Sequence, residues 1–227
     1  MEQRSVRVDA GPVTLQGDLT LPESARAVVL FAHGSGSGRF SPRNRYVAEL
    51  LNQAGLATLL VDLLTTEEEA IDMRTAHLRF DIGLLADRLI GATRWLKREP
   101  ATRDLHIGYF GASTGAGAAL VAAAELPDAI GAIVSRGGRP DLAGDALPRV
   151  SAPTLLIVGG NDPEVLELNR LALAQMRCER QLVVIPRATH LFEEPGTLNE
   201  AARLARDWFL RYLDPAKGDQ SREGAAA

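Results

Sequence analysis

Short apolar runs alternate with amphipathic stretches along almost the whole chain, and this alternation restricts the possible folds more than any other feature. The apolar runs have the length of strands and fall at residues 28–32, 56–61, 105–110, 129–134, 154–158 and 182–185. Runs without polar alternation are typical of parallel strands that are covered on both faces. Two earlier segments, near residues 5–9 and 13–21, alternate apolar with polar residues and predict an antiparallel pair at the sheet edge.

Helix-length stretches separate these runs, at residues 43–54, 81–96, 112–126 and 163–176, and a last one follows Thr197. Asp81 is placed to cap the second stretch, and Thr197 with Glu200 has the form of a capping box. Strands and helices in this order predict βαβ units with right-handed crossovers. We therefore expect an α/β fold with a mostly parallel, doubly wound sheet of about eight strands and no separate cap domain.

The length of 227 residues allows either one α/β domain or two small ones. Residues 1–213 contain neither an internal repeat nor a linker, which favours a single domain over this range. The hydrophobic content of 46% is ordinary for a globular chain. The tail, residues 214–227, lacks apolar periodicity, and we expect it to be disordered.

Charge and cysteine content restrict the partners and the compartment. Lys and Arg number 25 against 29 Asp and Glu, a net charge of −4 without a basic cluster, which argues against nucleic acid as a partner. The single Cys forms no intramolecular disulfide, and the N-terminus lacks the apolar core of a signal peptide. No apolar stretch approaches the ~20 residues of a membrane span. We expect a cytoplasmic monomer or homodimer that acts on a small molecule, not on membranes.

A glycine-flanked serine stands where a strand is expected to give way to a helix. The segment Gly111-Ala112-Ser113-Thr114-Gly115 directly follows the run at 105–110. This context is that of a nucleophile elbow, in which a sharp turn exposes the serine hydroxyl and the helix N-terminus supplies unpaired N–H groups for an oxyanion. The alternative is a structural or phosphate-binding turn, but the glycine and lysine positions of the Rossmann and Walker patterns are not matched.

A serine nucleophile needs a histidine base and an acid, which follow it in this order in such a fold. His190 is the one histidine after Ser113, and it lies in the loop behind the run at 182–185. Asp162 follows the run at 154–158 and is the favoured acid, although an Asp before Pro163 is also a good helix N-cap. Glu164 and Asp141 are alternative acids.

The small-residue loop at 33–38, His-Gly-Ser-Gly-Ser-Gly, follows the first apolar run. Such a loop lets the backbone approach the site and supply a second oxyanion donor beside the N–H of Thr114. We expect the N–H of Ser35 to be this donor, with Gly34 or Gly36 as alternatives. A flexible connector is the plainer interpretation of the same residues.

On these residues the chain resembles the α/β-hydrolase superfamily and, within it, the dienelactone hydrolase family. The resemblance covers residues 4–213 and rests on the segments HGSGSG, GASTGAG, GGND and ATHLF. It implies a serine esterase or lactonase that needs neither a metal nor a cofactor. The chain differs from the namesake enzymes at one position, because Ser113 stands where they carry Cys. We expect Cys178 instead to pack within a helix at residues 171–180.

The predicted reaction is hydrolysis of a carboxylic ester or lactone through an acyl-enzyme. Acyl transfer to another acceptor, peracid formation on the same triad, and a binding module without chemistry are the alternatives. Residues 63–79 are too polar for the core, and we expect them to form a short helix or flap over the carboxyl ends of the strands.

Two groups of side chains are candidates for contacts with the substrate, although core packing or solvation explains many of them equally well. Apolar candidates are Phe40, Leu63, Leu64, Met73, Leu191 and Phe192; arginines that could bind a substrate carboxylate are Arg39, Arg43, Arg45, Arg74, Arg79, Arg136 and Arg139.

Overall fold

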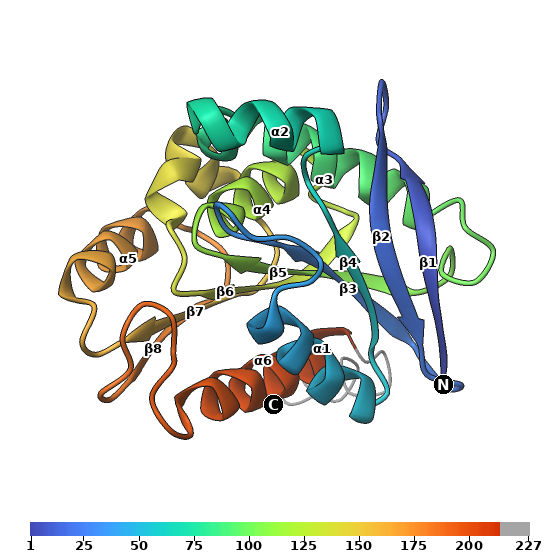
Figure 1. The fold of residues 1–227 in the computed structure, drawn as a ribbon. Helices are drawn as coiled ribbons and strands as arrows, with labels where there is room; N and C mark the ends of the chain where they lie inside the picture. The colour runs from blue at the N-terminus through green and yellow to red at the C-terminus, as the bar shows by residue number, and fades with distance from the viewer. Residues whose placement is uncertain (214–227) are drawn as a thin grey trace.

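The computed structural model describes residues 1–213, and the expected disorder of 214–227 lies outside the described residues. Its centre is an eight-stranded sheet with the order β1-β2-β4-β3-β5-β6-β7-β8 (Figure 1). The strands are β1 (Glu2–Asp9), β2 (Thr14–Leu21), β3 (Ala27–Ala32), β4 (Ala57–Val61), β5 (His106–Ala112), β6 (Ile130–Arg136), β7 (Thr154–Gly159) and β8 (Arg180–Ile185). The predicted α/β-hydrolase fold is confirmed.

The sheet is antiparallel only at its first edge, where β1 pairs with β2 and β2 pairs with β4, and all other pairs are parallel. Strands β3, β4 and β7 are buried along their whole length, as their apolar runs predict. Strand β8 was expected to be buried and is not, because it forms the far edge and Val184 is 38% exposed.

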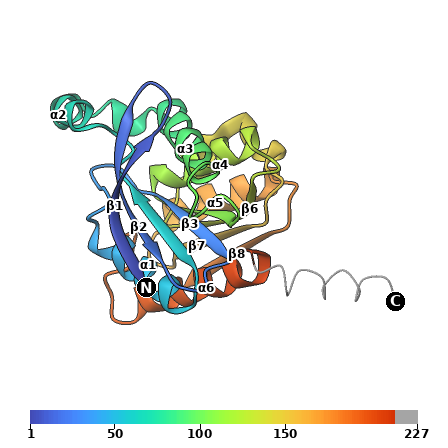
Figure 2. The same cartoon turned by 90° about the vertical axis from the view of Figure 1, so that its right-hand side faces the viewer.

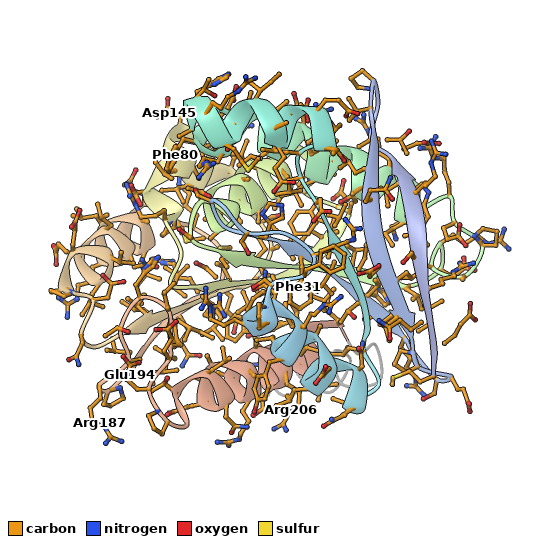
Figure 3. The ribbon with its side chains drawn as sticks, viewed as in Figure 1. Phe31, Phe80, Asp145, Arg187, Glu194 and Arg206 are labelled. Atoms are coloured by element: carbon orange, nitrogen blue, oxygen red, sulfur yellow. The ribbon has the colours of Figure 1, made fainter. Side chains whose placement is uncertain are left out.

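Two helical layers enclose the sheet (Figures 1 and 2). Helices α1 (Pro42–Gln53) and α6 (Thr197–Leu213) cover one face, and their apolar residues pack with Phe31, Phe110 and Phe192. In Figure 3, Phe31 lies between the sheet and α1. Helices α3 (Ile82–Leu96), α4 (Thr114–Glu125) and α5 (Pro163–Gln175) cover the other face, together with the 3₁₀ segment η2 (Pro140–Arg149).

The flap expected at residues 63–79 contains a helix, α2 (Thr66–Thr75), and a short 3₁₀ segment, η1 (Leu78–Phe80). Thr65 and Glu68 form a capping box at the start of α2, so a polar sequence with little apolar surface still begins a helix. Helix α2 lies at the outside of the molecule on the α3 and α4 side of the sheet (Figures 1 and 2).

Two local predictions are wrong. The hydroxyl of Thr197 donates to the carbonyl of Glu194 at 2.7 Å, while the N–H of Glu200 donates to the carbonyl of Gly196, so no capping box forms there. Cys178 lies behind the end of α5, in the bend that leads to β8, and packs against the core from outside a helix. Asp81 caps α3 as predicted, since its side chain accepts from the N–H of Leu84.

A bulge interrupts the pairing of β5 with β6. Ile107 pairs with Ile130, whereas Gly108 pairs with Ala132, so Gly131 is the extra residue on β6. Ile130 accordingly packs in the core under α3 and α4, while Ala132, two residues on, packs in the core under α1 and α6. Downstream of the bulge the register continues without a shift to the pair Ala112 and Arg136.

Candidate active site

Ser113 occupies a sharp turn between β5 and α4. Its backbone has φ 50° and ψ −126°, a conformation that costs a non-glycine residue about 1–3 kcal/mol and that concentrates at functional sites. A Cβ on Gly111 would lie 2.5 Å from Cα of Ala116, and one on Gly115 would collide with the carbonyl oxygen of Ala32. The two glycines therefore allow the strand, the turn and the helix to pack this closely.

His190 and Asp162 are brought together from two different loops. Nδ1 of His190 lies 2.8 Å from Oδ2 of Asp162, and the Asp162 side chain makes no capping hydrogen bond to α5. The competing N-cap role is therefore not the one that the carboxylate plays here. The alternative acids lie elsewhere: Asp141 forms an ion pair with Arg139, and Glu164 is exposed in the first turn of α5.

The register of the sheet relates the position of His190 to that of Ser113 through Gly137. Ala112 of β5 pairs with Arg136 of β6, so Ser113 and Gly137 are the residues that directly follow these two neighbouring strands. A Cβ on Gly137 would lie 3.0 Å from the carbonyl oxygen of His190 and 3.8 Å from its Nδ1. The imidazole thus covers the residue that neighbours the nucleophile candidate. Glu194 braces the loop by accepting from the N–H and the hydroxyl of Thr189, and these hydrogen bonds lower the pKa of Glu194.

The loop at 33–38 passes directly beside Ser113. A Cβ on Gly34 would lie 2.9 Å from Cβ of Ser113, and the hydroxyls of Ser35 and Thr114 are 3.0 Å apart. The two residues expected to donate to an oxyanion are therefore neighbours. Thr114 begins α4, and the first N–H groups of a helix have no partner within the helix.

His33 has a role in holding the loop at 33–38 that is not predicted above. Its Nε2 accepts from the N–H of Leu63 at 2.9 Å, so the proton is on Nδ1, which lies 3.0 Å from the carbonyl of Gly34. Burial lowers the pKa of His33 and keeps the ring neutral, as this pair of bonds requires. His33 thereby ties the loop at 33–38 to the end of β4. A histidine directly before the glycine-rich run was the signal in the sequence.

A cavity of about 270 Å³ lies beneath the flap and next to this loop. Its lining combines the polar loop with apolar side chains and flap carboxylates, and consists of His33, Gly34, Ser35, Gly36, Ser37, Asp62, Leu64, Glu69, Asp72, Met73, Arg79, Leu85 and Thr114. Asp72 joins α2 to η1, because its carboxylate accepts from the N–H groups of Leu78 and Arg79 and from Nε of Arg79. Although its burial opposes ionisation, these hydrogen bonds lower the pKa of Asp72.

The apolar substrate candidates fall into three groups. Leu64 and Met73 line the cavity beneath the flap. Leu63 and Phe192 are buried in the two cores, and Leu191, beside His190, is 41% exposed. Phe40 is not among the residues that line the cavity; it is exposed, and the guanidinium groups of Arg39 and Arg45 lie over its ring.

Most of the arginine candidates are held by carboxylates of the chain itself. Arg39 pairs with Asp62, Arg79 with Asp72, Arg139 with Asp141, Arg43 with Glu193, and Arg45 lies 3.7 Å from Asp18. Arg74 is exposed on α2. Arg136 is the exception among these candidates, because it is buried and the described residues give it no carboxylate.

Three further observations concern the chemistry that the described residues offer. Burial raises the pKa of the Cys178 thiol, which lies far along the chain from the serine turn and touches the Thr154 hydroxyl at 3.9 Å. Within residues 1–213, no cluster of three or more His, Cys, Asp or Glu side chains is arranged to hold a metal ion. Over the same range, no helix has the length and apolar character needed to cross a bilayer.

The family model for the dienelactone hydrolase family matches residues 15–214. The chain belongs to the dienelactone hydrolase family. A dienelactone hydrolase from Anabaena variabilis is similar over nearly its whole length, with 65% identity, a TM-score of 0.92, and coverage of 93% of this chain and 98% of that one.

Two other proteins are similar to this chain. A lidless α/β serine hydrolase from Xanthomonas campestris shares the fold at 21% identity and a TM-score of 0.73, with 94% of this chain and 96% of that one covered. A protein of Mycobacterium tuberculosis called a putative phosphoribosyl transferase is 61% identical over 213 residues. That match covers 94% of this dienelactone hydrolase family member but only 47% of the relative, so the chain spans about half the length of the curated relatives it matches.

Proposed function

We propose that this hydrolase cleaves carboxylic esters or lactones with Ser113 as nucleophile, His190 as base and Asp162 as the residue that orients it. The observation that carries the proposal is the placement of the hydrogen-bonded pair His190–Asp162 over Gly137, next in register to a serine held at φ 50°. A weak nucleophile, a base and an orienting acid in this order form the constellation that activates a hydroxyl.

The reaction runs in two matched halves. His190 takes the proton of the Ser113 hydroxyl while Oγ bonds to the ester carbon, and the N–H groups of Thr114 and Ser35 stabilise the oxyanion. The carbon–oxygen bond to the alcohol breaks, and the alcohol leaves with the proton from His190. A water molecule then gives its proton to His190 and attacks the acyl-enzyme, and Ser113 recovers its proton as the acid departs. Asp162 holds the imidazole with its proton on Nδ1 throughout.

The name of the mycobacterial relatives does not argue against this proposal. We attribute the phosphoribosyl transfer of that name to the part of those relatives outside the match, because this chain covers 47% of their length. The turn at residues 111–115 also lacks the glycine and lysine positions of the common phosphate-binding loops. The geometry at Ser113 supports acyl chemistry instead.

Substitution of the nucleophile tests the proposal most directly. Ser113→Ala removes the only atom that forms the acyl-enzyme, so we expect kcat for short 4-nitrophenyl esters to fall by about 10⁴-fold or more. The wild-type protein is also treated with a fluorophosphonate probe, and the adduct is located by mass spectrometry; we expect it on the peptide that contains Ser113.

Ser24→Ala is the matched control, since it removes an exposed hydroxyl from the turn between β2 and β3, outside the candidate site. It is expected to keep activity within about threefold. Full activity of Ser113→Ala, or an adduct on another peptide, would contradict the proposal. Product analysis with added alcohol or peroxide separates hydrolysis from acyl transfer and peracid formation.

A further inference from the structure

Strand β8 is an open edge of the sheet, at the end opposite to β1 (Figure 1). Its odd-numbered residues turn their peptide groups toward β7. The carbonyl of Glu179 accepts from the N–H of Thr154 at 2.9 Å, and the carbonyl of Ile185 accepts from the N–H of Gly160 at 2.9 Å. Since peptide groups alternate in direction along a strand, the even-numbered residues from 180 to 184 turn their N–H and C=O groups outward, to the side where no further strand follows.

The two edges of the sheet differ in how well they resist pairing with another chain. Strand β1 carries charged side chains along its length, at Glu2, Arg4, Arg7 and Asp9. Strand β8 has one charged residue, Arg180 at its start, and continues with Gln-Leu-Val-Val-Ile. Its register with β7 runs from 180 to 185 without a bulge. Charges, prolines and bulges are the usual protection of edge strands, so β8 is an edge that remains competent to pair.

Apolar side chains accompany the free peptide groups of β8. Val183 and Ile185 pack toward the core under α1 and α6, so Leu182 and Val184 face the other side of the sheet, where α5 lies. Leu182 is only half-buried there, and Val184 is 38% exposed. The edge therefore combines unpaired backbone groups with an uncovered apolar surface.

Helix α5 extends this apolar surface. Its Asn169 donates to the carbonyl of Gly138 at 3.0 Å, which fixes the flank of the helix that faces the centre of the sheet. At 100° per residue, Leu168 and Leu171 lie on the opposite flank, beside the β8 edge. Leu168 is half-buried and Leu171 is 55% exposed. Two leucines of α5 and two apolar residues of β8 thus form one uncovered strip.

We propose that β8 pairs antiparallel with β8 of a second copy of this chain, around a two-fold axis that passes through Val183 perpendicular to the sheet. In this register Leu182 of one copy lies opposite Val184 of the other. Both residues turn their peptide groups outward, so they exchange two hydrogen bonds, and the symmetry repeats the pair. The axis places both α5 helices on the same face, where their exposed leucines flank the paired strands.

The charges beside β8 favour a second copy as the occupant and favour this register. Glu179 precedes the strand and Arg187 follows it, and both are exposed. The two-fold at Val183 places Glu179 of each copy opposite Arg187 of the other, whereas an axis at residue 182 would place Arg180 against Val184. The contact is closed, because each copy uses its one unprotected edge. Specific interfaces bury about 1,200–2,000 Å² in total, and the leucines of α5 extend the strand contact toward this range.

Sedimentation measurements on the purified protein between about 1 and 100 µM test the dimer. We expect a species of twice 24.3 kDa with a dissociation constant below about 10 µM. Val184→Lys places a charge on each side of the axis and should raise this constant by at least about 30-fold. Its circular dichroism spectrum should match that of the wild type, because the side chain is 38% exposed. Ile71→Lys is the control: it changes an exposed apolar residue of α2 in the same way and should leave the constant within about threefold.

Cross-linking in a Cys178→Ala background tests the register. Val183 would lie opposite itself in a non-hydrogen-bonded pair with Cα atoms about 4.5 Å apart, within the roughly 4.4–6.8 Å that a disulfide spans. Val183→Cys should therefore form a disulfide-linked dimer under mild oxidation. Leu182→Cys and Val184→Cys should not do so separately, but a mixture of the two should form the mixed dimer.

Two results would overturn the proposal. One is a wild type that sediments as a single chain at 100 µM. The other is a dimer that survives Val184→Lys unchanged and is not cross-linked by Val183→Cys, since the copies would then meet through another surface. The pairing goes beyond the proposed function and does not depend on it, so the same masses and cross-links are expected when Ser113→Ala is added to each protein.

Discussion

At the scale of single residues, the thiol and the hydroxyl of this chain occupy opposite kinds of environment. Ser113 is held in a strained turn, a setting suited to the nucleophile that we propose. Cys178 packs against the core from a bend, where burial raises the pKa of the thiol, and thiolates are the reactive form of cysteine. The chain therefore carries a thiol that is unsuited to the role that Cys has in the namesake enzymes of its family.

Replacement of Cys178 checks this contrast. Cys178→Ala should retain at least about half of the wild-type kcat/KM, because it removes a sulfur remote from the reaction. Iodoacetamide at neutral pH should leave wild-type activity intact for the same reason. Loss of activity on alkylation, absent in Cys178→Ala, would show that the thiol communicates with the site.

Single-residue roles divide into those that the sequence predicts and those that it leaves open. The order of Ser113, Asp162 and His190 was predictable because each follows a strand at the carboxyl edge of the sheet. The use of the Asp162 carboxylate was ambiguous, since an Asp before Pro163 suits a helix cap equally well, and only the 2.8 Å contact with His190 decides between them. The isolation of Arg136 was not predictable, because the presence or absence of a carboxylate depends on residues distant in sequence.

At the scale of elements, the flap is held by hydrogen bonds within it and by the ion pair of Glu68 with Arg88 of α3 at 2.6 Å. Its helix begins at a capping box, and its far end is joined to η1 by the Asp72 carboxylate. Because hydrogen bonds lower the pKa of Asp72, its stabilising contribution is complete above the ordinary range of carboxyl groups and is lost as pH falls through the lowered value. The flap should therefore loosen under acid before the sheet does.

Hydrogen exchange tests the role of Asp72. In Asp72→Asn, residues 66–80 should exchange about fivefold faster or more at neutral pH, because the amide cannot replace an ionised acceptor of three hydrogen bonds. The wild type should approach the same rates, corrected for intrinsic exchange, only below about pH 4. Asp81→Asn is the control, since Asn caps a helix as well as Asp. Unchanged protection in Asp72→Asn would show that other contacts hold the flap.

Most elements were predictable from the sequence, because the spacing of the apolar residues and the length of each segment indicate the same kind of element. The failures have local causes. The pattern Thr-x-x-Glu at residues 197–200 suits a capping box. In the structure, however, the N–H of Glu200 donates to the carbonyl of Gly196, and the hydroxyl of Thr197 donates to the carbonyl of Glu194. Strand β8 is apolar like the inner strands, and only the strand order shows that it is an edge.

At the scale of the whole molecule, one sheet separates two cores. Trp95 of α3 packs against the core on one side, and Trp208 of α6 is buried in the core on the other. Both cores rest on the same strands, because alternate residues of β3 and β5 belong to opposite cores. Loss of one layer should therefore remove the support of the other.

Single-tryptophan variants measure this coupling. Trp95→Phe and Trp208→Phe each leave one reporter, and we expect the fluorescence transition of each to coincide with its own circular dichroism transition in urea to within about 0.2 M. The two variants need not have equal midpoints, because each loses different packing. A fluorescence transition well before the loss of secondary structure in either variant would mean that its layer unfolds separately.

The bulge at Gly131 determines where the positive charge of Arg136 lies. Side chains of a strand alternate, so an extra residue in a regular strand would move every later side chain to the other face. Arg136 lies six residues after Ile130, an even spacing that would place the two side chains on one face, but the bulge absorbs Gly131 and leaves Arg136 on the α1 and α6 side with Ala132 and Val134. The bulge works as a phase correction: one residue without a side chain, at the opposite end of the strand, keeps the faces of all later residues in step with β5.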